Sequence, residues 1–168
     1  MKLRKLTRSS FLCALSVALL YTASMFPTLS LTIAAVAGLM PKAAQLYCGR
    51  NYGAMAYAVS SLLALLMAPE KDIALLYTVF FGCYPLLKDL FETPDSKALR
   101  WAVKLVYFNS VFCALWFLAR ALVFGETPLF AWYFFALWAF LNVFFVVFDT
   151  AIGRLLGGLF YIRGAKNL

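Results

Sequence analysis

Long apolar runs separated by short polar gaps are the feature that most constrains the fold of this 168-residue chain. A helix that crosses a membrane needs about 20 mostly apolar residues, with a range of roughly 17–25. The runs predict spans at about residues 9–25, 28–46, 51–68, 73–87, 101–124 and 128–149. We therefore expect an all-α polytopic membrane protein, with residues 1–168 forming a single transmembrane helical domain of six spans.

The composition supports lipid as the solvent of this chain. Hydrophobic residues make up 65% of it and charged residues 13%, whereas soluble domains have about 45–50% apolar and about 25% charged residues. A soluble domain of this size keeps much of its surface in water and could not bury so many apolar side chains. Apolar residues also continue past Met25, so we expect the first run to be a span rather than a removed signal peptide.

The cationic side chains mark one side of the predicted bundle. With the N-terminus inside, all but two of the 15 Lys and Arg residues fall in inner segments; Lys71 and Arg120 are the exceptions. This asymmetry follows the positive-inside rule and predicts that both the N- and C-termini are cytoplasmic. The rule also explains the net charge of +8. Because no RNA- or DNA-binding motif is present, we expect no nucleic-acid partner.

Residues that commonly carry catalysis or bind metals are scarce. The absence of histidine excludes His-dependent triads and His-ligated metals. The four cysteines are far apart and contain no C-x-x-C pair, so we expect them to pack as small apolar residues. The sequence also lacks a P-loop, paired intramembrane carboxylates and an Asp-rich metal motif. We therefore expect no enzymatic activity, no metal and no cofactor.

Two predicted spans contain a proline near their end. The sequence also leaves undecided whether the last helix continues beyond its predicted span. Pro41 lies in the second span and Pro85 in the fourth. Proline is tolerated in a spanning helix when neighbouring groups bond to the backbone groups that it frees. Residues 150–162, after the last span, either extend that helix or lie on the surface.

Two features are candidates for docking a partner protein. Ala14 and Ala18 form an A-x-x-x-A pair, which clears one face of the first span for another helix. The sequence leaves open whether this face packs inside the bundle or against a partner. Lys88 and Glu92 are four residues apart, share a predicted helix face and could contact a cytoplasmic protein. Similar small-residue pairs are Ala34/Gly38, Ala54/Ala58 and Gly153/Gly157.

Polar residues within the last two spans are candidates for contacts between helices. Lys104 is expected to extend its ammonium group to the inner headgroups. Asn109 lies deeper in the same span and is expected to bond to another helix. Asp149, at the predicted inner end of the sixth span, is expected to pair with Arg154 or with a basic residue of another inner segment.

Aromatic residues gather near the predicted outer side, together with one arginine. One interpretation is an interfacial belt. The other is an outward-facing cavity, in which rings stack on a flat ligand and the arginine meets an anionic group. The candidate substrate-binding residues are Tyr21, Tyr77, Trp116, Arg120 and Trp132.

Several segments of the first 70 residues resemble the S components of energy-coupling factor (ECF) transporters. These are the basic residues 1–5, the segment LTRSSFLCALSVALL at 6–20, the turn at Pro27 and the segment GRNYGAMAYAVSSLL at 49–63. The chain length, the six spans and the cytoplasmic ends also fit that family. The segment LLYTVFFGCYPLLK at 75–88 additionally resembles small uncharacterised membrane proteins of Firmicutes, which imply no function.

The ECF resemblance implies a substrate-binding subunit of a vitamin-type or other small-molecule importer in the bacterial plasma membrane. In that family the first-helix A-x-x-x-A surface docks on a transmembrane coupling subunit, and two ATPases provide the energy. Here the loop after the first span is very short, whereas S components often use it as a gate. No substrate-specific motif is present, and the lack of histidine argues against a nickel- or cobalt-type member. The alternative is a membrane scaffold or assembly protein without a ligand.

Overall fold

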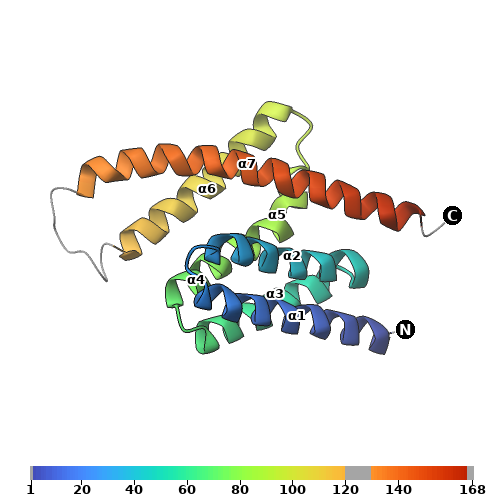
Figure 1. Cartoon of the computed structure of the whole chain (residues 1–168). Coiled ribbons are helices and arrows are strands. Elements are labelled where there is room, and N and C mark those ends of the chain that lie inside the picture. The colour runs from blue at the N-terminus through green and yellow to red at the C-terminus, as the bar shows by residue number, and fades with distance from the viewer. Residues whose placement is uncertain (1, 120–129, 166–168) are drawn as a thin grey trace. The chain divides into compact units, whose positions relative to one another are not determined.

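The computed structural model describes residues 2–119 and 130–165, with side chains described for residues 2–117 and 135–158. Every element in these ranges is helical, as the apolar runs predict. The chain divides into two compact units, Met1–Asp95 and Ser96–Leu168, whose helices are labelled in Figure 1.

The first unit consists of four helical segments packed on one another. They are α1 (Lys2–Met25), α2 (Ser30–Cys48), α3 (Arg50–Met67) and a composite helix of α4 (Lys71–Leu76), the π-helical turn η1 (Tyr77–Phe81) and α5 (Cys83–Phe91). Small side chains dominate the interior between them. Ala23, Ala34, Ala37, Ala44 and Ala74 have no exposed surface. Small residues at helix interfaces allow the backbones to approach closely.

Short turns connect the first three helices. The Leu29 N–H donates to the Phe26 carbonyl at 3.0 Å and closes the turn between α1 and α2. Between α2 and α3 the only residue is Gly49, with φ of +118° and ψ of +165°. A side chain at this position would be strained, because L residues rarely adopt such a backbone. Gly49 therefore lets the chain reverse within a single residue.

Among the described residues, five helices are long and apolar enough to cross a membrane. α3 has 18 residues but is not one of them, because Arg50 and Asn51 lower the mean hydropathy of its first turn. The structure thus agrees with apolar helices in contact with a bilayer, while the number of six spans stays a prediction. The five helices are Lys2–Met25, Ser30–Cys48, Lys71–Phe91, Lys97–Phe117 and Phe135–Gly158.

The second unit contains α6 (Lys97–Ala119) and α7 (Phe130–Ala165). The rings of Phe108 on α6 and Phe145 on α7 are stacked, with centroids 4.6 Å apart. α7 is 36 residues long, so residues 150–162 extend the last predicted helix. At 1.5 Å per residue it measures about 54 Å, well above the roughly 30 Å of a hydrocarbon core. All of α7 can therefore lie within the core only if the helix is tilted far from the membrane normal.

Candidate functional site

The small-residue pair of α1 lies on the surface of the first unit. Ala14 and Ala18 are both exposed. Large apolar side chains surround them on the same helix face: Phe11 is 69% exposed, Leu15 38% and Tyr21 44%. Within the first unit, this face therefore combines two small residues with large apolar neighbours that the other helices of the unit leave exposed.

Another small-residue pair has the opposite placement. Ala34 and Gly38 of α2 are buried, and a Cβ atom at Gly38 would collide with the backbone carbonyl of Phe81 in η1. This pair brings α2 against the composite helix within the unit. Ala54 and Ala58 of α3 are exposed like the pair on α1. The Ala34/Gly38 pair therefore packs helices of the unit together, whereas the Ala14/Ala18 and Ala54/Ala58 pairs lie on its surface.

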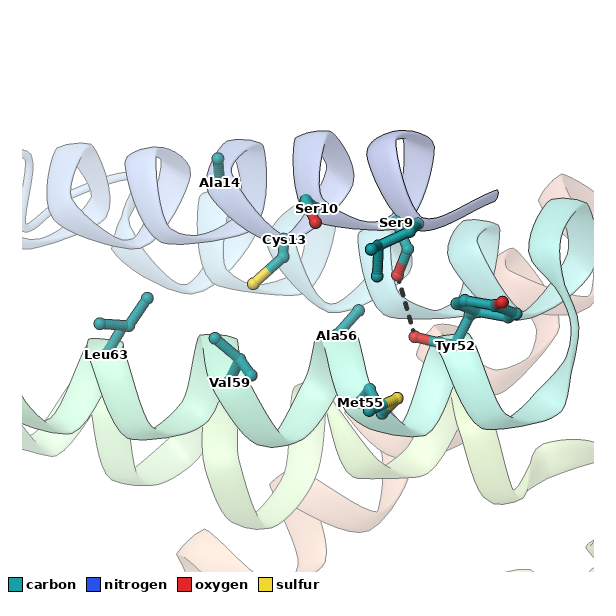
Figure 2. Close-up of a pocket in the computed structure, with 10 residues that line it drawn as sticks. Ser9, Ser10, Cys13, Ala14, Tyr52, Met55, Ala56, Val59 and Leu63 are labelled. Carbon is teal, nitrogen blue, oxygen red and sulfur yellow. Dashed lines mark hydrogen bonds between the residues drawn. The ribbon is translucent and has the colours of Figure 1, made fainter. Parts of the chain in front are cut away.

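A groove of about 350 Å³ lies between α1 and α3 beside the exposed pair. Figure 2 shows Ser9 and Tyr52 near one end of the groove, where the Ser9 hydroxyl donates to the Tyr52 carbonyl at 3.1 Å, and Leu63 toward the other end. Cys13 and Ala56, both buried, form the floor. The groove is mostly apolar. It begins with the first residues of the first predicted span, so the predicted topology places it in the inner half of the membrane.

A polar centre inside the first unit compensates for Pro41. Proline has no N–H, so Pro41 leaves the carbonyl of Ala37 without its helical partner. The Ser16 hydroxyl of α1 donates to this carbonyl at 3.0 Å. The expectation that a neighbour bonds to the backbone group freed by Pro41 is therefore confirmed. The residue that provides the bond, Ser16, was not singled out by the sequence.

Hydroxyl groups extend this centre across the unit. The Tyr77 hydroxyl lies 2.9 Å from Ser16 Oγ and 2.7 Å from Ser60 Oγ. These contacts connect α3, η1 and α1, and the bond from Ser16 to Ala37 extends them to α2. Ser60 Oγ also lies 3.0 Å from the Tyr57 carbonyl, so its proton has two acceptors.

The candidate substrate-binding residues have different surroundings. Tyr77 has no exposed surface and its hydroxyl is bonded on both sides, so here it serves the packing of the unit. Tyr21 is an exposed residue of α1. Trp116 is half-buried in α6, with its ring 6.1 Å from that of Phe112. Arg120 and the side chain of Trp132 lie outside the described residues. The predicted outer cavity therefore stays a prediction.

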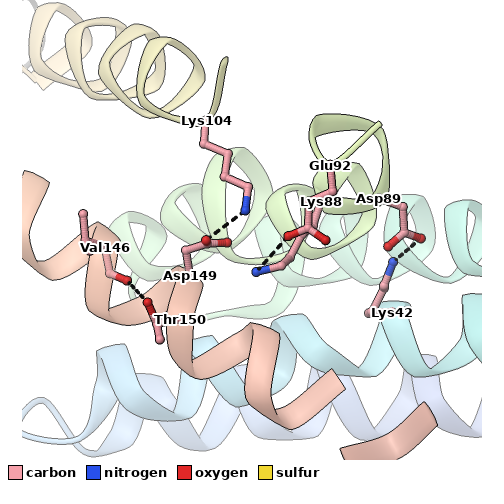
Figure 3. Close-up of polar contacts among 8 residues, drawn as sticks. All are labelled: Lys42, Lys88, Asp89, Glu92, Lys104, Val146, Asp149 and Thr150. Carbon is pink, nitrogen blue, oxygen red and sulfur yellow. Dashed lines mark hydrogen bonds and ion pairs between the residues drawn. The ribbon is translucent and has the colours of Figure 1, made fainter. Parts of the chain in front are cut away.

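Two lysine–carboxylate pairs occupy the predicted inner end of the first unit. Lys88 and Glu92 of the composite helix pair at 3.6 Å, as their spacing predicts. However, the Lys88 side chain is only 5% exposed and Glu92 43%, so a cytoplasmic protein would meet mainly the carboxylate. Beside them, Lys42 Nζ lies 2.6 Å from Asp89, with the Lys42 side chain fully buried. Figure 3 shows both pairs. The sequence did not predict the second.

The second unit contains a buried ion pair. Lys104 Nζ donates to Asp149 at 2.9 Å, and the two side chains are 7% and 5% exposed. Lys104 was expected to extend to the headgroups; instead it neutralises the charge of a carboxylate on the neighbouring helix. Asp149 does have a basic partner, as expected, and that partner is Lys104.

An amide pair lies further along the same two helices. Asn109 Nδ2 donates to Asn142 Oδ1 at 3.2 Å. The prediction that Asn109 bonds to another helix is therefore confirmed. The indole N–H of Trp138 donates to Asn109 Oδ1 and completes the cluster. These bonds satisfy polar groups that would otherwise be costly in an apolar environment.

Within the described ranges, no group of histidine, cysteine, aspartate or glutamate is arranged to hold a metal ion. The four cysteines are free; Cys13 and Cys48 are buried, and Cys83 and Cys113 are half-buried. Comparison with protein-family models, curated proteins and solved structures finds no match. The resemblance to ECF S components therefore stays an expectation from the sequence.

Proposed function

We propose that this chain is the substrate-binding membrane subunit of a vitamin-type or other small-molecule importer. It spans a bacterial plasma membrane six times with both ends in the cytoplasm. A transmembrane coupling subunit, which carries two ATPases, docks on Ala14 and Ala18. The proposal combines the resemblance of the N-terminal segments to ECF S components with five helices that are apolar enough to cross a membrane.

The observation that carries the proposal is the exposure of Ala14 and Ala18 on α1. A small-residue pair that packed its own bundle would be buried, as Ala34 and Gly38 are. Without a hydrophobic force between helices in lipid, association depends on close packing, which exposed small residues permit. The face around Ala14 and Ala18 therefore suits a partner helix.

Co-purification tests this proposal. The full chain is isolated in mild detergent from membranes of the organism that encodes it, and its companions are identified by mass spectrometry. We expect an ATPase pair and a polytopic coupling subunit. Replacing Ala14 and Ala18 together with leucine is expected to abolish co-purification, because the added side chains fill the helix contact.

Ala54 and Ala58 supply the matched control. They form the same A-x-x-x-A pair, exposed on α3, and their double replacement with leucine should leave the complex intact. A wild-type chain that brings down no ATPase would overturn the importer proposal and favour the scaffold alternative. Equal losses from both double variants would show that the partner does not recognise the α1 face.

A further inference from the structure

The composite helix changes its hydrogen-bond pattern at η1. In a regular α-helix the Gly82 N–H would donate to the Thr78 carbonyl, four residues earlier. Here it donates to the Tyr77 carbonyl at 2.7 Å, five residues earlier. A π-helical turn of this kind accommodates one extra residue within an α-helix. Relative to a continuous α-helix, α5 is therefore rotated by about 100°.

Tyr57 of α3 bonds to the carbonyl that this turn leaves without its α-helical donor. Its hydroxyl donates to the Thr78 carbonyl at 2.6 Å, in place of the Gly82 N–H. A Cβ atom at position 82 would lie only 2.9 Å from the Tyr57 ring, so glycine at this position lets the ring pack against the turn. The Tyr57 hydroxyl thus competes with the Gly82 N–H for one carbonyl and favours the π-helical turn.

The side chains of α5 show a burial pattern that favours the other register. Lys88 is buried whereas Leu90 is 55% exposed, which reverses the usual placement of these residue types. If η1 became a regular α-helical turn while α4 stayed in place, each position of α5 would be taken by the preceding residue. Leu87 would then take the buried position of Lys88. Leu90 would take that of Phe91, and both changes would bury apolar surface.

The ion pair between Lys42 and Asp89 opposes this change. Lys42 of α2 is fully buried, and Asp89 is its one acidic partner among the described residues; Figure 3 shows the pair beside Lys88. In the α-helical register Lys88 would take the position of Asp89 and face Lys42. A buried ammonium group would then lie beside a second cation, which is unfavourable. The ion pair and Tyr57 therefore hold the present register against the apolar pattern of α5.

We propose that η1 is a conformational switch with two registers, and that the shift moves Lys88 from the interior to the surface at the end of α5. A ligand or partner that binds one register better shifts the population toward it. One that attracts the Lys88 ammonium group would select the α-helical register. The switch depends on the packing of the first unit and not on import, so it can hold even if the importer proposal fails.

Two labelling reactions on the full chain in mild detergent test this proposal. The first is acylation of Lys88 by a water-soluble amine reagent, measured by mass spectrometry relative to the exposed Lys97. The second is alkylation of a Leu90→Cys variant by a water-soluble maleimide, with the four native cysteines replaced by alanine. A register shift exposes position 88 and buries position 90, so the two reactions should change in opposite directions.

Tyr57→Phe should raise Lys88 acylation about fivefold, the change that one hydrogen bond typically produces. Adding Lys42→Met removes both the ion pair and the repulsion from Lys88, so acylation should rise further and alkylation at position 90 should fall. Tyr52→Phe is the matched control, because the Tyr52 hydroxyl has no hydrogen bond within the described ranges. Adding Leu90→Gln to Tyr57→Phe should return acylation toward the wild-type rate, since the shift would then bury an amide.

Three results would overturn the switch. The first is Lys88 acylation that stays at the wild-type rate in Tyr57→Phe and in the double variant with Lys42→Met. The second is a rise in both reactions, which would mean that α5 loosens without changing register. The third is a rise in acylation that Leu90→Gln does not reverse. Opposite changes at positions 88 and 90, with Tyr52→Phe like the wild type, would support it.

Discussion

The two units of this chain hold their helices together by different means. The first unit brings backbones close through alanine, glycine and serine, and its polar centre consists of neutral hydroxyls around Tyr77. The second unit joins two helices through larger groups: the Lys104–Asp149 ion pair, the Asn109–Asn142 amides and stacked phenylalanine rings. Close backbones gain from dispersion, whereas long side chains gain from specific polar pairing.

This difference in helix contacts predicts which substitutions each unit tolerates. Where backbones touch, added volume is costly. Where long side chains form pairs, removing one partner leaves a buried polar group without compensation, and its cost is large. We therefore expect added volume to be most costly at the close backbone contacts of the first unit, and loss of a charged partner to be most costly at the Lys104–Asp149 pair of the second unit, where both side chains are buried.

The largest effect is expected from Asp149→Ala. It leaves the Lys104 ammonium buried without its partner, and breaking a buried pair typically costs about 3–5 kcal/mol. The free energy of unfolding of the full chain, measured by denaturant titration in detergent with circular dichroism, should fall by this amount. Arg154→Gln, an exposed charge on the same helix, is the control. Replacing both partners, Lys104→Met with Asp149→Leu, should recover most of the loss; no recovery would show that the pair is not the unit's main polar contact.

Gly38→Ala tests the close packing of the first unit. Its new methyl group would overlap the Phe81 carbonyl, and overpacking of this kind costs about 1–3 kcal/mol of unfolding free energy. The matched control is Gly158→Ala in α7, where a Cβ meets no atom within 4 Å; there alanine should stabilise the helix slightly. Equal effects of the two variants in the same titration would contradict close backbone contact in the first unit.

Ser16→Ala removes the hydroxyl that bonds to the Ala37 carbonyl. A buried carbonyl left without a donor costs about 1–3 kcal/mol, and we expect a loss near the middle of that range. Ser24→Ala is the control, because Ser24 is also buried in α1 but donates to Leu20 of its own helix. A Ser16→Ala variant as stable as Ser24→Ala in thermal unfolding would argue against the hydroxyl chain as a stabilising element.

The smallest effect is expected from the amide pair. Interhelical hydrogen bonds in membrane proteins average about 0.6 kcal/mol, with a maximum near 1.7 kcal/mol. A double-mutant cycle with Asn109→Ala and Asn142→Ala measures the coupling between the two side chains, and we expect a value in that range. Ser110→Ala serves as control, since Ser110 donates to Val106 in its own helix. Zero coupling would leave the ion pair and the rings as the contacts of the second unit.

Helix positions could be predicted from the sequence because they depend on local properties. A helix that crosses a membrane needs enough apolar residues to match the hydrocarbon thickness, and that requirement can be read from each run separately. The boundaries were less accurate. The fourth span was predicted at 73–87, whereas the composite helix covers Lys71–Phe91. Its polar first and last turns carry no hydropathy signal.

The sequence could predict that a polar residue bonds to another helix, but not which residue it bonds to. Asn109 was expected to bond to another helix, but Asn142 could not be named, because the partner depends on how the two helices are rotated and aligned. The same holds for Lys104 and Asp149. Ser16 had one usable signal: Pro41 must free the carbonyl four residues earlier, so a donor near Ala37 was required. Nothing local points to Ser16 rather than to another hydroxyl of the first helix.

The bond from Ser16 to Ala37 makes the residue needed at position 16 depend on the proline at position 41. Any ordinary residue at position 41 would restore the missing N–H and make the serine hydroxyl redundant. A lineage that loses the proline can then lose the serine freely, while one that keeps the proline must retain a small hydroxyl-bearing residue at position 16. Sequences descended from a common ancestor with this chain should therefore show correlated change at these two sites, even though they lie on different helices.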